Sequence, residues 1–174
     1  METVLLPIWV QGATAFRDTN YGTSAEMQIK RTLNPGSGRG RRGFIRFDTS
    51  GVAGAVSSAR MRIYAKLSDA TLTPTGMIVQ KVTDTVWDEL AVTWNLQPAV
   101  SAPTALSSIT VAGIEGGYYE FDLTNFIRQE RAAGRNVVSL RFINQQATGN
   151  SGSSYTAINS KEAASAQPQL VIEQ

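Results

Sequence analysis

The chain has 174 residues, 42% of them hydrophobic, and its 16 Lys and Arg against 14 Asp and Glu leave a net charge of +2. This composition suits one folded domain with a sizeable core and excludes a disordered chain. The sequence has no run of about 18 apolar residues, so no membrane span is predicted. The absence of cysteine excludes disulfides and Cys-ligated metals, and the absence of histidine removes the usual general base and zinc ligand. A bound metal would therefore be a hard, oxygen-ligated ion such as calcium.

The opening segment METVLLPIWV contains an apolar octet that predicts the first strand, with Thr3 to Val10 entering it. A signal peptide needs positive charge where Glu2 stands, and no small-residue cleavage site follows. We interpret Met1 as an initiator placed on a mature or excised module. The module is then expected to be secreted, with its signal peptide outside this sequence.

Short blocks with period-2 alternation follow, separated by Gly, Pro, Asn and Ser. They are AEMQIKR (25–31), GFIRFD (43–48), ARMRIYAKL (59–67), GMIVQKV (76–82), YYEFDL (118–123), NVVSLRFIN (136–144) and PQLVIE (168–173). LTNFIRQERAAG (123–134) predicts one short helix, with Thr124 as N-cap and Gly134 as its end. Residues 1–174 are thus expected to form a single all-β domain, an antiparallel β-sandwich of the jelly-roll type with one short helix.

The segment NPGSGRGRRGFIRFD (34–48) places four arginines within eight positions. It is compatible with a solvated hairpin, a nucleic-acid-binding arm or one wall of a site for an acidic polymer. Nucleic acid is the less favoured ligand, because arginine-rich binders gain from interleaved aromatic residues and this loop has none.

Two further motifs each have a structural and a functional interpretation. Trp87 and Trp94 in VWDELAVTWN could stack on sugar rings, but we favour a structural role in which both side chains fill the edge of the sandwich. Asp18 and Asn20 in RDTNYG are weaker candidates for a structural calcium site, since the segment equally suits a tight turn.

Catalysis is not expected. Glycoside hydrolysis needs two carboxylates across a cleft, and no pair of acids stands in a context that would place them. A polysaccharide lyase needs a base, and without histidine a tyrosine would have to serve.

The segments TNYGTSAEMQIK, RRGFIRFDTSGVAGAVSSARMRIYA, VWDELAVTWNLQPAV, YYEFDLTNFI and NSKEAASAQPQLVI, in this order, resemble the DNRLRE-type domain, also known as carbohydrate-binding module family 96. The resemblance runs from about Phe16 to Ile172. It implies a jelly-roll module attached to, or encoded near, polysaccharide-degrading enzymes, in a family with alginate-binding members.

Strand alternation places a set of basic, aromatic and amide side chains on outward positions, and the resemblance implies that their strands are neighbours. Such a face would pair Arg and Lys with uronate carboxylates, stack Tyr on sugar rings and bond hydroxyls through Gln and Asn, with the Arg39–Arg42 loop closing one end. The candidate ligand-binding residues are Gln28, Lys30, Arg42, Arg46, Arg62, Tyr64, Arg141, Tyr155, Asn159 and Lys161.

The sequence therefore predicts a non-catalytic, monomeric module that binds an anionic polysaccharide, alginate or a related polyuronate. It would need no cofactor and would target an attached polysaccharide-degrading enzyme. The alternative is a structural or adhesive β-sandwich of a surface protein, without a glycan ligand.

Overall fold

The computed structural model describes residues 3–34, 37–100, 103–148 and 154–174. Met1, interpreted above as an initiator, and Pro35 and Gly36 of the Arg-rich segment lie outside the described residues. Within these ranges, no helix is long and apolar enough to cross a membrane.

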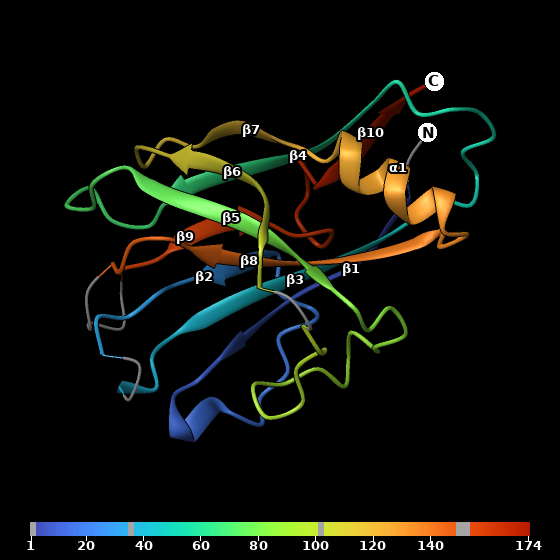
Figure 1. The fold of residues 1–174 in the computed structure, drawn as a ribbon. Coiled ribbons are helices and arrows are strands. Elements are labelled where there is room, and N and C mark those ends of the chain that lie inside the picture. The colour runs from blue at the N-terminus through green and yellow to red at the C-terminus, as the bar shows by residue number, and fades with distance from the viewer. Residues whose placement is uncertain (1–2, 35–36, 101–102, 149–153) are drawn as a thin grey trace.

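Two antiparallel sheets face each other in a β-sandwich (Figure 1), which confirms the predicted fold class. Sheet A has the order β1 (Thr3–Gln11), β3 (Arg41–Asp48), β8 (Val137–Asn144), β5 (Thr75–Val82) and β6 (Ala105–Val111). In sheet B, β4 (Ser58–Leu67) pairs with β7 (Gly117–Asp122) on one side and with β10 (Gln169–Glu173) and β9 (Thr156–Asn159) on the other, and β9 pairs with β2 (Glu26–Ile29). The chain repeatedly crosses between the sheets, as in a jelly roll.

Some details differ from the sequence prediction. Strand β6 was not predicted, because its ALSSITV sequence lies at the edge of sheet A, where only Val111 is buried, and lacks a strong apolar face. The short 3-10 helix η1 (Thr14–Phe16) was also not predicted. Helix α1 (Thr124–Ala132) is present, but Leu123 holds the N-cap position, and the hydroxyl and N–H of Thr124 donate to Asp122 Oδ1. The predicted end is confirmed, since Gly134 has a φ of +71°.

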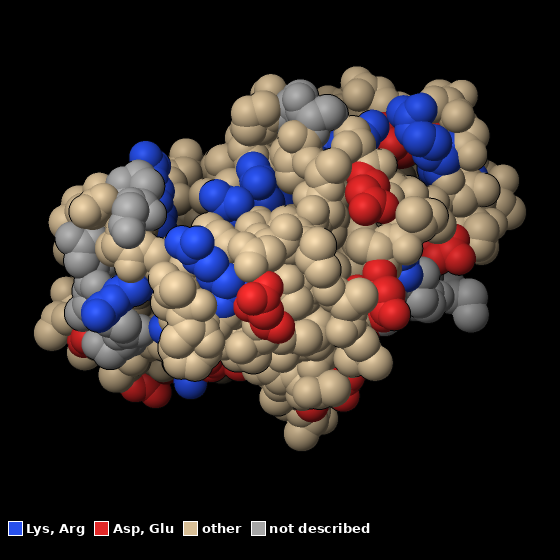
Figure 2. Space-filling view, turned by 90° about the horizontal axis from the view of Figure 1, so that it is seen from below, with Lys and Arg blue, Asp and Glu red and all other residues tan. Residues whose placement is uncertain are grey.

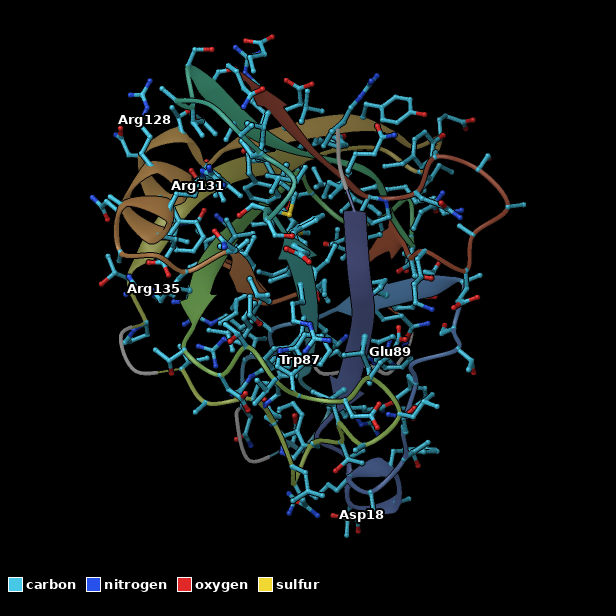
Figure 3. All side chains as sticks on the ribbon, turned by 90° about the vertical axis from the view of Figure 1, so that its right-hand side faces the viewer. Asp18, Trp87, Glu89, Arg128, Arg131 and Arg135 are labelled. Atoms are coloured by element: carbon cyan, nitrogen blue, oxygen red, sulfur yellow. The ribbon has the colours of Figure 1, made fainter. Side chains whose placement is uncertain are left out.

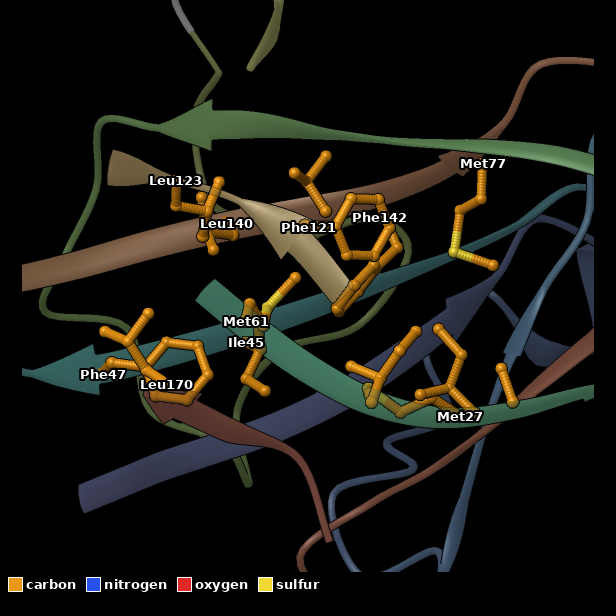
Figure 4. Packing of buried hydrophobic residues seen from close by; sticks show 14 of the residues in the cluster. Met27, Ile45, Phe47, Met61, Met77, Phe121, Leu123, Leu140, Phe142 and Leu170 are labelled. Atoms are coloured by element: carbon orange, nitrogen blue, oxygen red, sulfur yellow. The ribbon is translucent and has the colours of Figure 1, made fainter. Parts of the chain in front are cut away.

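The main core lies between the sheets and is rich in Phe, Met and branched side chains (Figure 4). Phe121 of sheet B and Phe142 of sheet A meet there, with ring centroids 6.0 Å apart. A second cluster covers the outer side of sheet A, where Ile8 and Phe44 pack against Trp87 of the loop 83–104. The outer side of sheet A is therefore partly covered by this loop, and only the remainder is open to a ligand.

The start of β1 and the C-terminus lie near each other, beside α1 (Figure 1). The loop with η1 and the loop between β2 and β3 lie at the other end of the sandwich. Connections to the rest of a longer polypeptide would therefore leave that other end unobstructed.

Candidate functional site

The ten predicted ligand-binding residues do not share one face. Arg42, Arg46 and Arg141 point outward from sheet A, because the residues that alternate with them on β3 and β8 fill the core. Arg62 and Tyr64 point outward from sheet B. The expected single basic face is wrong, since these strands belong to opposite sheets. The remaining residues lie on β2, on β9 or directly beside those strands: Gln28, Lys30, Tyr155, Asn159 and Lys161.

Arg46 fastens the loop 83–104 to sheet A. Its Nη1 donates to the carbonyl oxygens of Thr85 and Trp87, both at 2.9 Å, and its guanidinium lies 5.1 Å from the Trp87 ring centroid. Trp87 is buried, and its Nε1 donates to Ser139 Oγ at 2.8 Å. Trp87 thus has the structural role favoured from the sequence, and Arg46 is engaged beneath the loop rather than open to a ligand.

Arg42 and Arg141 form a pair on the open part of the same face. Arg42 Nη1 donates to Gln97 Oε1 at 2.9 Å, and Arg141 donates to Gln80 Oε1 through Nη2 at 2.6 Å and through Nε at 3.2 Å. Burial, and then the neighbouring charge of Arg42, lowers the pKa of Arg141. Within the described residues, no carboxylate forms an ion pair with either arginine. Each of the two neighbouring cations is thus held by a neutral amide oxygen, Arg42 by Gln97 and Arg141 by Gln80, and this leaves their charge uncompensated.

A pocket of about 250 Å³, here called the basic pocket, opens beside Arg42. Figure 2 shows several Lys and Arg side chains on the left of the surface, with a second group at the upper right. At Gly38 the Arg-rich segment packs directly on the backbone of Gly12. Only glycine suits this position, because its φ is +68° and a Cβ there would lie 2.9 Å from Gly12 O. The lining residues are Lys30, Arg31, Thr32, Gly38, Gly40, Arg41, Arg42, Trp94 and Ile143.

Trp94 forms the aromatic wall of the basic pocket. The Arg42 guanidinium carbon lies 4.7 Å from its ring centroid. The ring packs tightly on Gly12, where a Cβ would lie 2.7 Å from a ring atom. Trp94 is half-buried. It therefore has a supporting role, as predicted, and also contributes apolar surface to the pocket.

Lys30 is a buried cation in the pocket wall. Its Nζ donates to Ser154 O at 2.6 Å. Burial, followed by the charges of Arg41 and Arg39, lowers the pKa of Lys30 to about 8. Lys30 is thus not on the open face that the strand alternation predicted, and its charge titrates close to neutral pH.

Two predicted contacts, Gln28 and Tyr155, are engaged by the buried Arg41. Arg41 Nη1 donates to Gln28 Oε1 at 2.7 Å. The guanidinium carbon lies 4.9 Å from the Tyr155 ring centroid and 5.7 Å from that of Trp9. Lys30 and Arg41 also exchange backbone hydrogen bonds, so this cluster closes the sandwich between β2 and β3.

Lys161 and Asn159 are also occupied within the fold. Lys161 Nζ lies 3.3 Å from Glu89 Oε2 and pairs with Glu162 as well, so its charge is compensated. Asn159 Nδ2 donates to Ser165 O at 3.1 Å and ties down the loop between β9 and β10.

The RDTNYG segment forms the tight turn favoured from the sequence. Asn20 Nδ2 donates to the carbonyls of Glu89 and Val92 at 2.6 and 2.8 Å, and its Oδ1 accepts from Gly22 N at 3.0 Å. Asp18 accepts from Asn95 and lies apart from Glu89 (Figure 3). Among the described residues, no three Asp or Glu side chains gather closely enough to hold a metal ion by themselves.

A larger hollow of about 410 Å³ lies beside α1, at the other end of the molecule. Its buried Glu130 is 2.6 Å from both Lys81 and Arg135. Because Glu130 already pairs with both of these cations, this hollow is a weaker candidate for an anionic ligand.

Sequence reasoning missed Arg31, Gln80 and Gln97. Gln80 interrupts an apolar strand, and its register partner on β8 is Arg141. The interruption was visible in the sequence, but the pairing of β5 with β8 was not. Gln97 reaches Arg42 only because of the path of the loop 83–104.

A β-sandwich whose surface pocket combines basic and aromatic side chains is compatible with a carbohydrate-binding module. The family model for carbohydrate-binding module family 96 matches residues 8–174, and the chain belongs to this family. The predicted family is confirmed, and membership indicates a non-catalytic module that binds glycans.

Two known proteins are similar to this chain. A gellan lyase from Bacillus sp is 28% identical over 151 residues, which are 84% of this chain and 6% of that protein. The chain thus spans only a small part of this relative. The CBM22-1 xylan-binding domain of Xyn10C from Paenibacillus barcinonensis has a TM-score of 0.37 and 9% identity, covering 98% of this chain and 95% of the domain.

Proposed function

We propose that this module binds an acidic polysaccharide, with alginate as the first candidate, at the basic pocket and at Arg141, which lies beside it. The observation that carries the proposal is the Arg42–Arg141 pair, which is held by amide oxygens and has no carboxylate partner among the described residues. A guanidinium fork matches a carboxylate, and alginate presents one carboxylate on each sugar residue.

The pocket supplies two further features for such a ligand. Lys30 and Arg31 add positive charge to its wall, and Trp94 adds an apolar surface for a pyranose ring. An exposed, charge-dominated site should bind weakly, with a dissociation constant roughly in the micromolar to sub-millimolar range, and more weakly at high salt.

The module would act as a targeting device within a longer, secreted polypeptide. Support comes from the much longer lyase relative and from the two chain ends, which lie away from the basic pocket. In this arrangement the module, as a monomer without a cofactor, would hold an attached polysaccharide-degrading enzyme near its substrate. Gellan, named in that relative, is the second candidate ligand.

Calorimetric titration tests the proposal. Alginate oligosaccharides are titrated at low and high salt, beside gellan oligosaccharides, a neutral cello-oligosaccharide and single-stranded DNA. Binding to an acidic oligosaccharide that weakens with salt and survives EDTA supports the proposal. Binding to DNA alone, or to none of these ligands, would overturn it, and the second outcome would favour a purely structural module.

A further inference from the structure

The outer side of sheet B carries an exposed aromatic group, the tyrosine platform, defined as Tyr118, Tyr64 and Arg62. Tyr118 belongs to strand β7 of the sandwich, yet it is 53% exposed. The Arg62 guanidinium carbon lies 4.1 Å from the Tyr118 ring centroid, and the Tyr64 ring meets it edge-on at 5.3 Å. The exposed ring is therefore held in one orientation from two sides.

Local structure fixes the supporting members of the platform. Tyr64 Oη donates to Glu115 O at 3.2 Å. Gly116 has a φ of +81°, and a Cβ there would lie 2.6 Å from the Tyr64 ring, so only glycine lets the turn pack on this tyrosine. Pairing register places Arg62 opposite Glu120, yet no ion pair joins them within the described residues, and the guanidinium stacks on Tyr118 instead.

A polar hollow of about 280 Å³ lies beside the Tyr118 ring. Its other side is the loop between β9 and β10, which Asn159 holds through Ser165 O. The exposed side chain of Gln169 faces this hollow and makes no hydrogen bond within the described residues. The hollow is smaller than the roughly 300–1,000 Å³ of pockets for drug-sized ligands, so it suits a single small ring. The lining residues are Tyr118, Ala164, Ser165, Ala166, Gln167 and Gln169.

We propose that the tyrosine platform is a second carbohydrate subsite, which stacks one pyranose ring on Tyr118 and offers Arg62 and Gln169 as hydrogen-bond donors. A flat ring flanked by polar donors matches the apolar face and hydroxyl rim of a sugar. A protein partner would instead favour a larger apolar patch. The platform lies on the outer side of sheet B, whereas the basic pocket is lined by Arg41 and Arg42 of β3 and by Trp94, and the two sites share no residue, so the module is bivalent and can join two polysaccharide chains.

This inference rests on membership of a carbohydrate-binding family and not on the charge of the ligand at the basic pocket. The test follows backbone amide shifts by NMR while an alginate hexasaccharide or cellohexaose is added. The variants are Tyr118→Ala, Tyr118→Phe, Ile114→Ala and the double variant Arg42→Ala with Arg141→Ala. Unchanged melting temperatures confirm that each variant is folded.

The expected result for the wild type is two separate groups of shifted amides, one on each sheet, with at least one of the two probes. Tyr118→Ala should remove the group on sheet B and leave the other, whereas Tyr118→Phe and the equally peripheral Ile114→Ala should keep both. Wild-type protein should also raise the viscosity of polymeric alginate more than Tyr118→Ala does, because only a bivalent module links chains.

The outcomes separate the two proposals. Shifts confined to the basic pocket would overturn the platform and leave the proposed function intact. Shifts confined to the platform would support this inference while contradicting the basic pocket. Loss of the sheet B shifts in Ile114→Ala as readily as in Tyr118→Ala would overturn the stacking role of Tyr118.

Discussion

The guanidinium of Arg42 lies over the ring of Trp94, 4.7 Å from its centroid, while its Nη1 donates to Gln97 Oε1. All three side chains belong to one arrangement, in which the loop 83–104 holds an arginine of β3 in a fixed position. A pre-positioned guanidinium loses less conformational entropy on binding than a mobile one. This relationship is the structural basis of the proposed binding site.

Replacing either arginine of the pair should weaken alginate binding without unfolding the module. Each of Arg42→Ala and Arg141→Ala is expected to raise the dissociation constant about 5- to 10-fold, the loss of one charge-assisted hydrogen bond at a partly exposed site. Calorimetry with alginate oligosaccharides measures the effect. Arg60→Ala is the matched control, since it removes the same charge from an exposed position on sheet B. An equal loss in Arg60→Ala would show that only net charge matters.

Gly12→Ala should displace Trp94, because the added Cβ would lie 2.7 Å from its ring. Overpacking of this kind costs about 1–3 kcal/mol of unfolding free energy, and the shifted ring should also weaken alginate binding. Urea denaturation and calorimetry measure the two effects. Gly51→Ala, where nothing lies within 4 Å of the Cβ position, should change neither. Full affinity in Gly12→Ala would remove Trp94 from the binding site.

Arg46→Ala should lower the free energy of unfolding. It removes two charge-assisted hydrogen bonds to the backbone of the loop 83–104, at a cost of about 2–3 kcal/mol. Where the loop keeps its place in the folded variant, as unchanged backbone amide shifts of Trp94 and Gln97 would show, alginate affinity should stay close to that of the wild type. Weakened binding with these shifts unchanged would instead restore Arg46 as a ligand contact, the role that its outward strand position suggested.

The fold was largely predictable from the sequence, whereas the site was not. Alternation identified β2, β3, β4, β5, β7, β8 and β10, and Gly134 marked the end of the helix. Alternation also assigned Arg46, Arg62 and Arg141 correctly to outward positions. It could not say which sheet each strand joins, because strand pairing depends on contacts distant in sequence, so residues on opposite faces were combined into one.

The long-range contacts of basic residues were equally hidden. Lys30 follows the polar phase of its strand, yet it is buried, since the chain bends toward β3 at that point. Lys161 meets Glu89 across a separation of 72 residues that no local pattern reveals. A charged residue at an outward position can therefore serve the fold as readily as a ligand.

Alginate affinity should fall as the pH rises from 7 to 9. The pKa of Lys30 is lowered to about 8, so its charge is lost within this range, while burial raises the pKa of the nearby Tyr155 above its usual 10.0. Arg41 and Arg42, which line the basic pocket, keep their charge throughout. Lys30→Met should bind more weakly at pH 7 and show a flat profile, measured by calorimetry in buffers of equal ionic strength. A wild-type profile that is already flat would show that Lys30 does not contribute charge to the ligand.

Folding stability should follow the opposite trend above pH 8. The pKa of Lys30 is about 8 in the folded chain and 10.5 ordinarily, so between these values the unfolded chain binds the additional proton. Stability therefore rises with pH across this window through Lys30. Urea denaturation of the wild type and of Lys30→Met at pH 8 and pH 10 isolates this contribution as the difference between the two proteins. A larger rise with pH in Lys30→Met would contradict the assignment.

The most direct test of the central claim is a calorimetric titration of alginate hexasaccharide into the wild type and into the Arg42→Ala, Arg141→Ala double variant, each at 20 mM and 300 mM NaCl. We expect the wild type to bind, and to bind more weakly at high salt, because salt screens charge–charge contacts. The folded double variant should lose most of this affinity. Equal affinity of the two proteins at low salt would exclude the arginine pair as the binding site and place the polysaccharide elsewhere on the module.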